Sequence, residues 1–213
     1  MNQDVIKKGQ FLNFLLVEGK DDEHVFYSLL EHYQVPERFK IKNKEGIDRL
    51  LETLDVEIDQ SGLERLGIVV DADTDIVTRW QSLRNILINC GYSGVPVTPA
   101  PNGTILIQEN RPVVGIWLMP DNEVAGMLEN FVSFLVPVDD LLWPMAGEIV
   151  RQVMEKDCRF PSAHEIKARL YTWLAWQKEP GKPMGQSITA RYLDADAPHA
   201  QQLVDWLRKL FDL

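Results

Sequence analysis

Cysteine and histidine are scarce in this chain. Two cysteines, Cys90 and Cys158, and four histidines are spread over 213 residues. Neither cysteine has other metal-binding side chains nearby at a useful spacing, which argues against both a disulfide framework and a zinc site. We therefore expect both cysteines to pack against other side chains, and the histidines to lie at the surface or at helix ends.

Long apolar runs and the common nucleotide and metal signatures are also missing. No apolar stretch approaches the roughly 18 residues that span a bilayer, and the N-terminal MNQDVIKKGQ lacks the apolar core of a signal peptide. We expect no membrane association and a cytoplasmic location. There is no Walker loop and no GxGxxG, and an HExxH motif fails because His164-Glu165 is followed by Ile166-Lys167-Ala168.

Positive charge is in short supply. The net charge is −10, which disfavours a simple nucleic-acid coat protein because such proteins bind phosphates through an excess of cations. The distribution is uneven, since residues 151–191 contain eight basic and four acidic side chains. This pattern fits an acidic metal site beside a surface that contacts phosphate, and it equally fits a solvated helical face.

What the chain does have is an alternation of strands and helices. Apolar runs predict strands at residues 11–17, 39–42, 66–70 and 113–119, and amphipathic patterns predict helices at 21–33, 47–58, 75–90 and 123–135. Residues 94–111, rich in proline and containing Asn102-Gly103, predict a hairpin or an excursion beside the sheet, with a short β-like run at 104–108. Such alternation is typical of an α/β fold with a Rossmann-type parallel sheet flanked by helices.

The pattern changes after residue 136. We predict an α/β domain over residues 1–136 and an α-helical C-terminal extension over 137–213, packed on the first domain. The extension shows amphipathic helices at 142–154, 164–176 and 199–210, and a loop at 179–186 where two prolines and two glycines occur. Four tryptophans in this region are expected to be core residues rather than base-stacking platforms: Trp143, Trp173, Trp176 and Trp206.

Carboxylates stand where two of the predicted strands end. Glu18 and Asp22 follow the first strand, and the sequence DADTD (71–75) follows the third. Because the carboxyl ends of parallel strands share one edge of a sheet, we expect these acids to form one cluster there. Oxygen ligands of this kind suit Mg²⁺, with Mn²⁺ as a substitute. The candidate metal ligands from this argument are Glu18, Asp22, Asp71, Asp73 and Asp75.

Each acid also has a structural interpretation. Asp21, Asp22 and Asp75 are residue types that cap helices. Glu18 is a poor cap, and standing beside a buried strand it needs a charged or metal partner. Asp71 and Asp73 would repel each other unless a cation lies between them. Lys20 is a candidate catalytic residue, either as that cation or as a contact to substrate phosphate, although a solvated lysine explains it too.

The two motifs together resemble a known family. VEGKDD (17–22) after one apolar strand and DADTD (71–75) after a later one are similar to the Toprim domain of topoisomerases, bacterial-type primases, OLD-family nucleases and related proteins. The resemblance implies acid/base chemistry or metal binding for Glu18, magnesium binding for Asp71 and Asp73, and, as in OLD-type nucleases, a further ligand in Asp22. GIWLMPDN (115–122) and GMLEN (126–130) resemble an uncharacterised stand-alone Toprim-like group, which would add Asp121 and Glu129.

Two functions from different classes follow. The first is Mg²⁺-dependent phosphodiester chemistry on nucleic acid, as in a Toprim-type nuclease, with Lys178 or Lys182 reaching a phosphate if their loop folds over the acidic edge. The second is a non-catalytic Toprim-like module that binds metal, nucleotide or a partner protein. DADTD also resembles the nucleophile motif of haloacid-dehalogenase-type phosphatases, but its fifth residue, Asp75, departs from that pattern.

Overall fold

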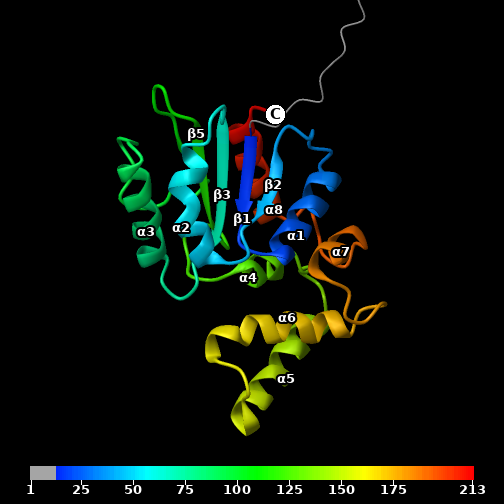
Figure 1. Ribbon diagram of the computed structural model, residues 1–213. Coiled ribbons are helices and arrows are strands. Elements are labelled where there is room, and N and C mark those ends of the chain that lie inside the picture. The colour runs from blue at the N-terminus through cyan, green and yellow to red at the C-terminus, as the bar shows by residue number, and fades with distance from the viewer. Residues whose placement is uncertain (1–12) are drawn as a thin grey trace, which may run out of the picture.

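The structure is a computed structural model that describes residues 13–213, and it has a five-stranded sheet at its centre (Figure 1). The strand order is β2-β1-β3-β5-β4. Four strands are parallel, and β4 runs antiparallel to β5 at one edge. The strands are β1 (Asn13–Val17), β2 (Lys40–Asn43), β3 (Arg65–Asp71), β4 (Thr104–Leu106) and β5 (Val113–Met119). The predicted α/β fold with a helix-flanked sheet is thus confirmed, and the sheet is mostly parallel.

Alternating side chains of the strands build two separate cores. On β1, Phe14 and Leu16 point to the face covered by α2 (Ile47–Ile58) and α3 (Ile76–Asn89), whereas Leu15 and Val17 point to the other face. This is the period of two expected for a strand buried on both sides. The second face is covered by α1 (Lys20–His32) and by helices from the C-terminal half of the chain (Figure 1).

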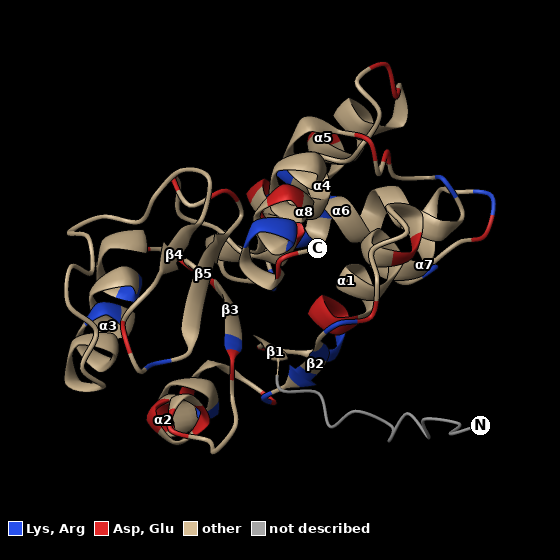
Figure 2. Ribbon diagram, turned by 90° about the horizontal axis from the view of Figure 1, so that it is seen from above, with Lys and Arg blue, Asp and Glu red and all other residues tan. Residues whose placement is uncertain are grey.

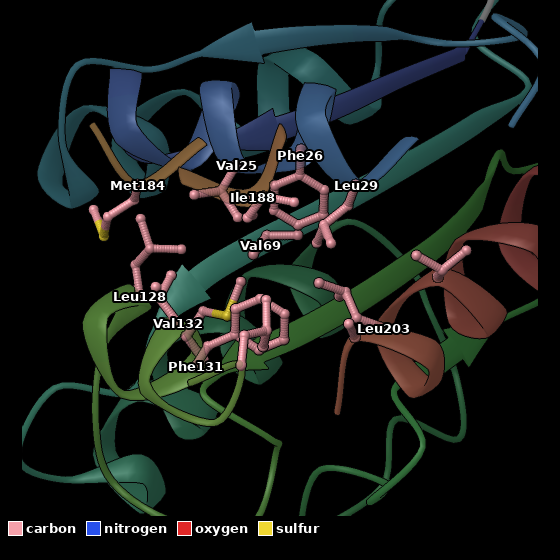
Figure 3. Close-up of a cluster of buried hydrophobic side chains, with 14 of the residues drawn as sticks. Val25, Phe26, Leu29, Val69, Leu128, Phe131, Val132, Met184, Ile188 and Leu203 are labelled. Atoms are coloured by element: carbon pink, nitrogen blue, oxygen red, sulfur yellow. The ribbon is translucent and has the colours of Figure 1, made fainter. Parts of the chain in front are cut away.

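That second core joins segments that are far apart in the sequence. Figure 3 shows Val25 and Phe26 of α1 beside Val69 of β3, with Leu128 of α4 (Leu128–Ser133) and Ile188 of α7 (Met184–Thr189) completing the cluster. All five side chains are almost completely buried. The remaining helical elements are α5 (Leu142–Asp157), the 3₁₀ turn η1 (Ser162–His164), α6 (Glu165–Ala175) and α8 (Pro198–Phe211).

Helix α8 lies directly against the middle of the sheet. Gly67 of β3 and Gly115 of β5 are paired across the ladder, and they leave the space that the Leu210 side chain fills. A Cβ atom on Gly115 would lie 2.5 Å from Cδ2 of Leu210, closer than packed carbon atoms approach. The end of the chain is therefore part of the core of the α/β sheet. The boundary at residue 136 stays a prediction.

Several element predictions were inaccurate. The helix predicted at 123–135 is wrong in its first half, because α4 begins only at Leu128. Before it, Asn122 and Gly126 have positive φ angles, and Asp73 N donates to Gly126 O at 2.8 Å, so this segment pairs with the loop after β3. The loop predicted at 179–186 is wrong in its last part, where α7 begins at Met184. There a glycine, Gly185, allows close contact with the backbone of α1.

Further predictions concern the ends of two strands, the cysteines and the tryptophans. Residues 11 and 12 of the first predicted strand are outside the described residues. The β-like run at 104–108 is shorter than predicted, since β4 ends at Leu106. Cys90 is buried as expected, but Cys158 is exposed, which corrects the prediction that both cysteines pack. Of the C-terminal tryptophans, Trp173 and Trp206 are core residues, whereas Trp176 is 39% exposed. No helix within residues 13–213 is long and apolar enough to cross a membrane.

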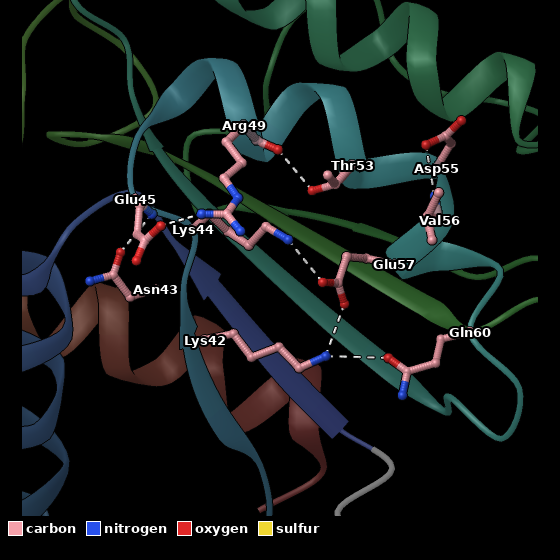
Figure 4. A network of polar contacts seen from close by, with 10 residues as sticks. All are labelled: Lys42, Asn43, Lys44, Glu45, Arg49, Thr53, Asp55, Val56, Glu57 and Gln60. Atoms are coloured by element: carbon pink, nitrogen blue, oxygen red, sulfur yellow. Dashed lines mark hydrogen bonds and ion pairs between the residues drawn. The ribbon is translucent and has the colours of Figure 1, made fainter.

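Charged side chains join the edge strand β2 to helix α2 (Figure 4). Glu57 accepts hydrogen bonds from Lys42 and Lys44, both at 2.9 Å, and Lys42 also donates to Gln60. Burial would raise the pKa of Glu57, but the two ammonium groups outweigh it and hold that pKa below its ordinary value. Elsewhere, lysines and arginines are distributed over several helices rather than along one stripe (Figure 2).

Candidate functional site

The acidic ends of β1 and β3 meet. These two strands are neighbours in the sheet, and Glu18 and Asp71 stand at the same edge. Oε1 of Glu18 accepts a hydrogen bond from the backbone N–H of Asp71 at 2.7 Å. This contact fixes the first carboxylate beside the second strand end. Both residues line a cavity of about 550 Å³, called here the acidic cavity.

Asp22 reaches the same cavity from the first turn of α1. Its Oδ2 accepts a hydrogen bond from the backbone N–H of Gly19 at 3.0 Å, so the side chain folds back over the turn between strand and helix. Gly19 fits here because a Cβ atom would come within 3.3 Å of that oxygen. Asp22 is 8% exposed. It therefore combines a capping role with burial beside two other acids.

A fourth carboxylate comes from α4. Oδ1 of Asp71 accepts a hydrogen bond from the backbone N–H of Leu128 at 2.9 Å, which holds the start of α4 against the end of β3. The next residue, Glu129, is 4% exposed and forms an ion pair with Lys167 of α6 at 2.7 Å. In Figure 1, α4 and then α6 lie beyond the carboxyl end of β1. Helix α6 thus supplies a cation to the acidic cavity.

Burial and mutual repulsion disturb the ionisation of these acids. Burial, together with the charges of Glu18, Asp22 and Glu129, raises the pKa of Asp71 to about 9. Burial and the charge of Glu18 raise the pKa of Asp22 to about 7. The pKa of Glu18 is also raised, chiefly by burial. Strongly perturbed carboxyl groups in a cavity are a recognised mark of functional sites.

The other predicted ligands differ in their surroundings. Asp73 lines the acidic cavity and forms an ion pair with Arg79 of α3. Asp75 caps α3, accepting from the backbone N–H groups of Val77 and Thr78 and from the Thr78 hydroxyl. Asp121 holds a turn through the backbone N–H groups of Glu123 and Val124. Neither Asp75 nor Asp121 is among the residues that line the acidic cavity.

Of the three lysines suggested by the sequence, one lies at the site. Lys20 lines the acidic cavity, but within residues 13–213 the structure has no ion pair for it. Lys182 pairs with Glu179 at 2.9 Å, and neither it nor Lys178 lines the cavity. The cations that do pair with the acids are Arg79 and Lys167.

Helix α6 carries a stripe of polar residues beside the site. Lys167 and Tyr171 follow His164 by three and seven residues, and this spacing places all three on one face of a helix. His164 and Lys167 line the acidic cavity, and the Tyr171 hydroxyl donates to Oδ2 of Asp21 at 3.4 Å. A polar stripe of this kind is common on solvated helices, so the spacing alone could not identify the sheet edge it covers.

The carboxylates lie close to one another, but their present arrangement is not a complete metal-binding site. Among residues 13–213, no three His, Cys, Asp or Glu side chains have the arrangement that would hold an ion as they stand. Backbone N–H groups bind one oxygen each of Glu18, Asp22 and Asp71. A carboxylate has two oxygens, and each can accept more than one hydrogen bond or metal contact.

Comparison with known families identifies the family of this chain. The model of the family described as "Protein of unknown function (DUF3226)" matches residues 12–212, so the chain belongs to that family. Comparisons with curated proteins and with solved structures found no match. The family covers both the sheet and the C-terminal helices, which agrees with the packing of α8 against β3 and β5. The resemblance to Toprim domains stays a prediction.

Proposed function

We propose that this protein cleaves phosphodiester bonds in nucleic acid with the help of Mg²⁺ bound in the acidic cavity. The observation that carries the proposal is the convergence of Glu18, Asp22, Asp71 and Glu129, with the pKa of Asp71 raised to about 9 by burial and by the neighbouring acids. Folding brings these charges together at a cost to stability. A divalent cation would relieve the repulsion, as it does in other carboxylate sites.

The donor set suits a hard cation. Every candidate ligand offers carboxylate oxygens, which Mg²⁺ and Mn²⁺ accept readily. Glu18 and Asp71 are held at strand ends by backbone hydrogen bonds, so their carboxylates are positioned before a ligand arrives. A bound magnesium ion would polarise the phosphate and lower the pKa of an attacking water.

In this proposal the residues that line the acidic cavity have different roles. Glu18 and Asp71 are the principal ligands, with Asp22, Asp73 and Glu129 in support. Lys167, which already lies within an ion-pair distance of Glu129, would contact a substrate phosphate, and Lys20 stands at the rim of the same cavity. In this proposal the carboxylates of Asp75 and Asp121 hold turns and take no part in metal binding.

The resemblance to Toprim proteins supports the same reaction. In that family a glutamate after the first strand and an Asp-x-Asp after a later strand serve metal-dependent chemistry, and Glu18, Asp71 and Asp73 stand at those positions. Nucleic acid is therefore the proposed substrate, and the proposed location is the cytoplasm. The alternative is a non-catalytic module that binds metal, nucleotide or a partner protein, and it requires no cleavage.

The test combines metal binding with cleavage. We expect Mg²⁺ or Mn²⁺ to raise the melting temperature of the wild type, and we expect labelled DNA and RNA oligonucleotides to be cut only when metal is present. Glu18→Gln should lose at least 100-fold in cleavage rate, in line with the loss of one metal ligand or one general acid or base. Asp71→Asn should lose the metal-dependent stabilisation.

Asp75→Ser is the matched control. It removes a carboxylate from the same DADTD segment but keeps a side chain that caps helices well. We expect it to keep both metal binding and cleavage. If neither metal changes the melting temperature of the wild type, the proposed metal site is refuted. Metal binding without cleavage of any oligonucleotide would favour the non-catalytic module.

A further inference from the structure

A second cavity adjoins the acidic cavity. It has a volume of about 290 Å³ and lies between the loop after β3, the segment leading into α4, and the start of α6. Asp73 and Met127 line both cavities. The region from η1 to α6 borders both as well, with His164 and Lys167 on the acidic cavity and Ser162 and Arg169 on the second. The two cavities therefore share part of their lining beside the start of α6, and together they are called here the trough.

An arginine in the wall of the second cavity is held in a fixed position. Nε and Nη2 of Arg169 donate to the backbone carbonyl of Trp143 at 3.2 and 3.0 Å. Its guanidinium lies over the Trp143 ring, 3.8 Å from the ring centroid. Gly147 leaves room for it, since a Cβ atom there would approach Nε to 3.0 Å. Such a group can present a donor to a ligand with little loss of side-chain entropy.

The chemistry of the lining favours an uncharged ligand group. Met127 and Ile166 provide apolar surface, and Thr74 and Ser162 provide hydroxyl groups. Asp73 and Glu165 also line this cavity, so a second phosphate inside it would face two carboxylates and one guanidinium. A nucleoside, with an apolar ring face and polar edges, meets these conditions better than a phosphate does.

We propose that the second cavity binds the nucleoside next to the phosphate held in the acidic cavity, so that the substrate is a single nucleic-acid strand that crosses the start of α6. This inference rests on the proposed function and names its substrate class. The volume of about 290 Å³ is just below the roughly 300–1,000 Å³ found for ligand sites, which suits one nucleoside with its base unpaired. A small phosphate ester would occupy the acidic cavity alone.

The test uses substitutions that fill the second cavity and leave the carboxylates unchanged. Ala163→Trp and Ser162→Trp each place an indole on η1, where both native residues are exposed and line only the second cavity. Ser61→Trp is the matched control, because it adds a similar bulk, without a change of charge, at an exposed position outside both cavities. Circular dichroism and melting curves show whether each variant is folded.

Two substrates separate the two cavities. With Mn²⁺, the cavity-filling variants should lose at least tenfold in kcat/KM on single-stranded oligodeoxyribonucleotides and oligoribonucleotides. Their rate on the small diester bis(4-nitrophenyl) phosphate should stay within twofold of the wild type, and Ser61→Trp should match the wild type on both. Unchanged oligonucleotide cleavage would overturn the inference, and so would an equal loss on both substrates, because the acidic cavity would then be the part affected.

Binding provides a readout that does not need turnover. Fluorescence anisotropy with labelled single-stranded oligonucleotides should show at least tenfold weaker binding for a cavity-filling variant than for Ser61→Trp. If the wild type cleaves neither substrate, the proposed function fails while this measurement still tests the trough. Equal affinity in the filled and control variants, or no binding by the wild type, would overturn the inference.

Discussion

At the scale of single residues, Asp71 occupies an electrostatically unfavourable position. Its carboxylate occupies a strand end where burial and four neighbouring acids raise its pKa to about 9. An acid whose pKa is higher in the folded than in the unfolded chain holds a proton that the unfolded chain has released. Between the unfolded value near 3.8 and the folded value of about 9, stability therefore falls as the pH rises.

Asp71→Asn should make the metal-free protein more stable at high pH. The amide oxygen can still accept from the backbone N–H of Leu128, and the repulsion with Glu18 and Asp22 disappears. We expect the melting temperature in EDTA to rise by a few degrees at pH 8, where about 1 kcal/mol corresponds to roughly 2–4 °C in a chain of this size. The gain should shrink toward pH 4.

The measurement is a set of melting curves of wild type and variant across that pH range. Asp71→Ala is the control that also removes the hydrogen bond to Leu128, and it should gain less than Asp71→Asn. A lower melting temperature for Asp71→Asn at pH 8 would show that the carboxylate is stabilising. The electrostatic description of the site would then be wrong.

At the scale of elements, the contact between α8 and the sheet depends on two paired glycines. Leu210 fills the space above Gly67 and Gly115, and a Cβ atom on Gly115 would lie 2.5 Å from Leu210 Cδ2 and 2.8 Å from Cδ1. Both Cδ atoms belong to the side chain of Leu210, which is completely buried. The helix therefore has little room to move away from an added methyl group.

Gly115→Ala should destabilise the protein through this contact. Overpacking of a dense core costs about 1–3 kcal/mol, which urea unfolding would detect as a lower midpoint with an unchanged slope. Leu210→Ala alone should also destabilise, by leaving a cavity. The double variant should be more stable than the sum of the two single effects predicts, because the new methyl group then meets no leucine. Strict additivity would contradict the proposed contact.

The elements also show what the sequence could and could not predict. Strands β1 and β3 and the acids at their ends were predictable, because a run of apolar residues that stops at Glu18 or Asp71 is a local pattern. The start of α4 was not, because it depends on the pairing of Asp73 with Gly126 and on the hydrogen bond between Asp71 and Leu128. Those partners lie more than 50 residues apart in the chain.

At the scale of the whole molecule, the C-terminal helices contribute to the sheet edge as well as to the core. Helix α8 packs on β3 and β5, and α6 reaches the acidic cavity through Lys167. Nothing in the local sequence around Lys167 indicates this, because its partner Glu129 belongs to a different helix. Prediction from sequence was therefore better for the fold of the sheet than for the cations around the acidic cavity.

Lys167→Met should reveal how strongly α6 is tied to that cavity. The side chain of Glu129 is 6% exposed and that of Lys167 46%, so the pair is intermediate between exposed pairs, worth up to roughly 1 kcal/mol, and buried pairs, whose disruption costs about 3–5 kcal/mol. The variant leaves Glu129 buried among other acids without its cation. We expect a loss of stability between these limits in metal-free buffer.

Glu129→Gln separates loss of the pair from loss of packing. This variant removes one charge that raises the pKa of both Asp22 and Asp71, so it should cost little or nothing in metal-free buffer. In the double variant, Lys167→Met should cost much less than it does in the wild type, because no buried carboxylate is left uncompensated. An unchanged cost would mean that Lys167 acts through its aliphatic packing on α4. The charge pair would then contribute nothing to holding α6 over the ends of the strands.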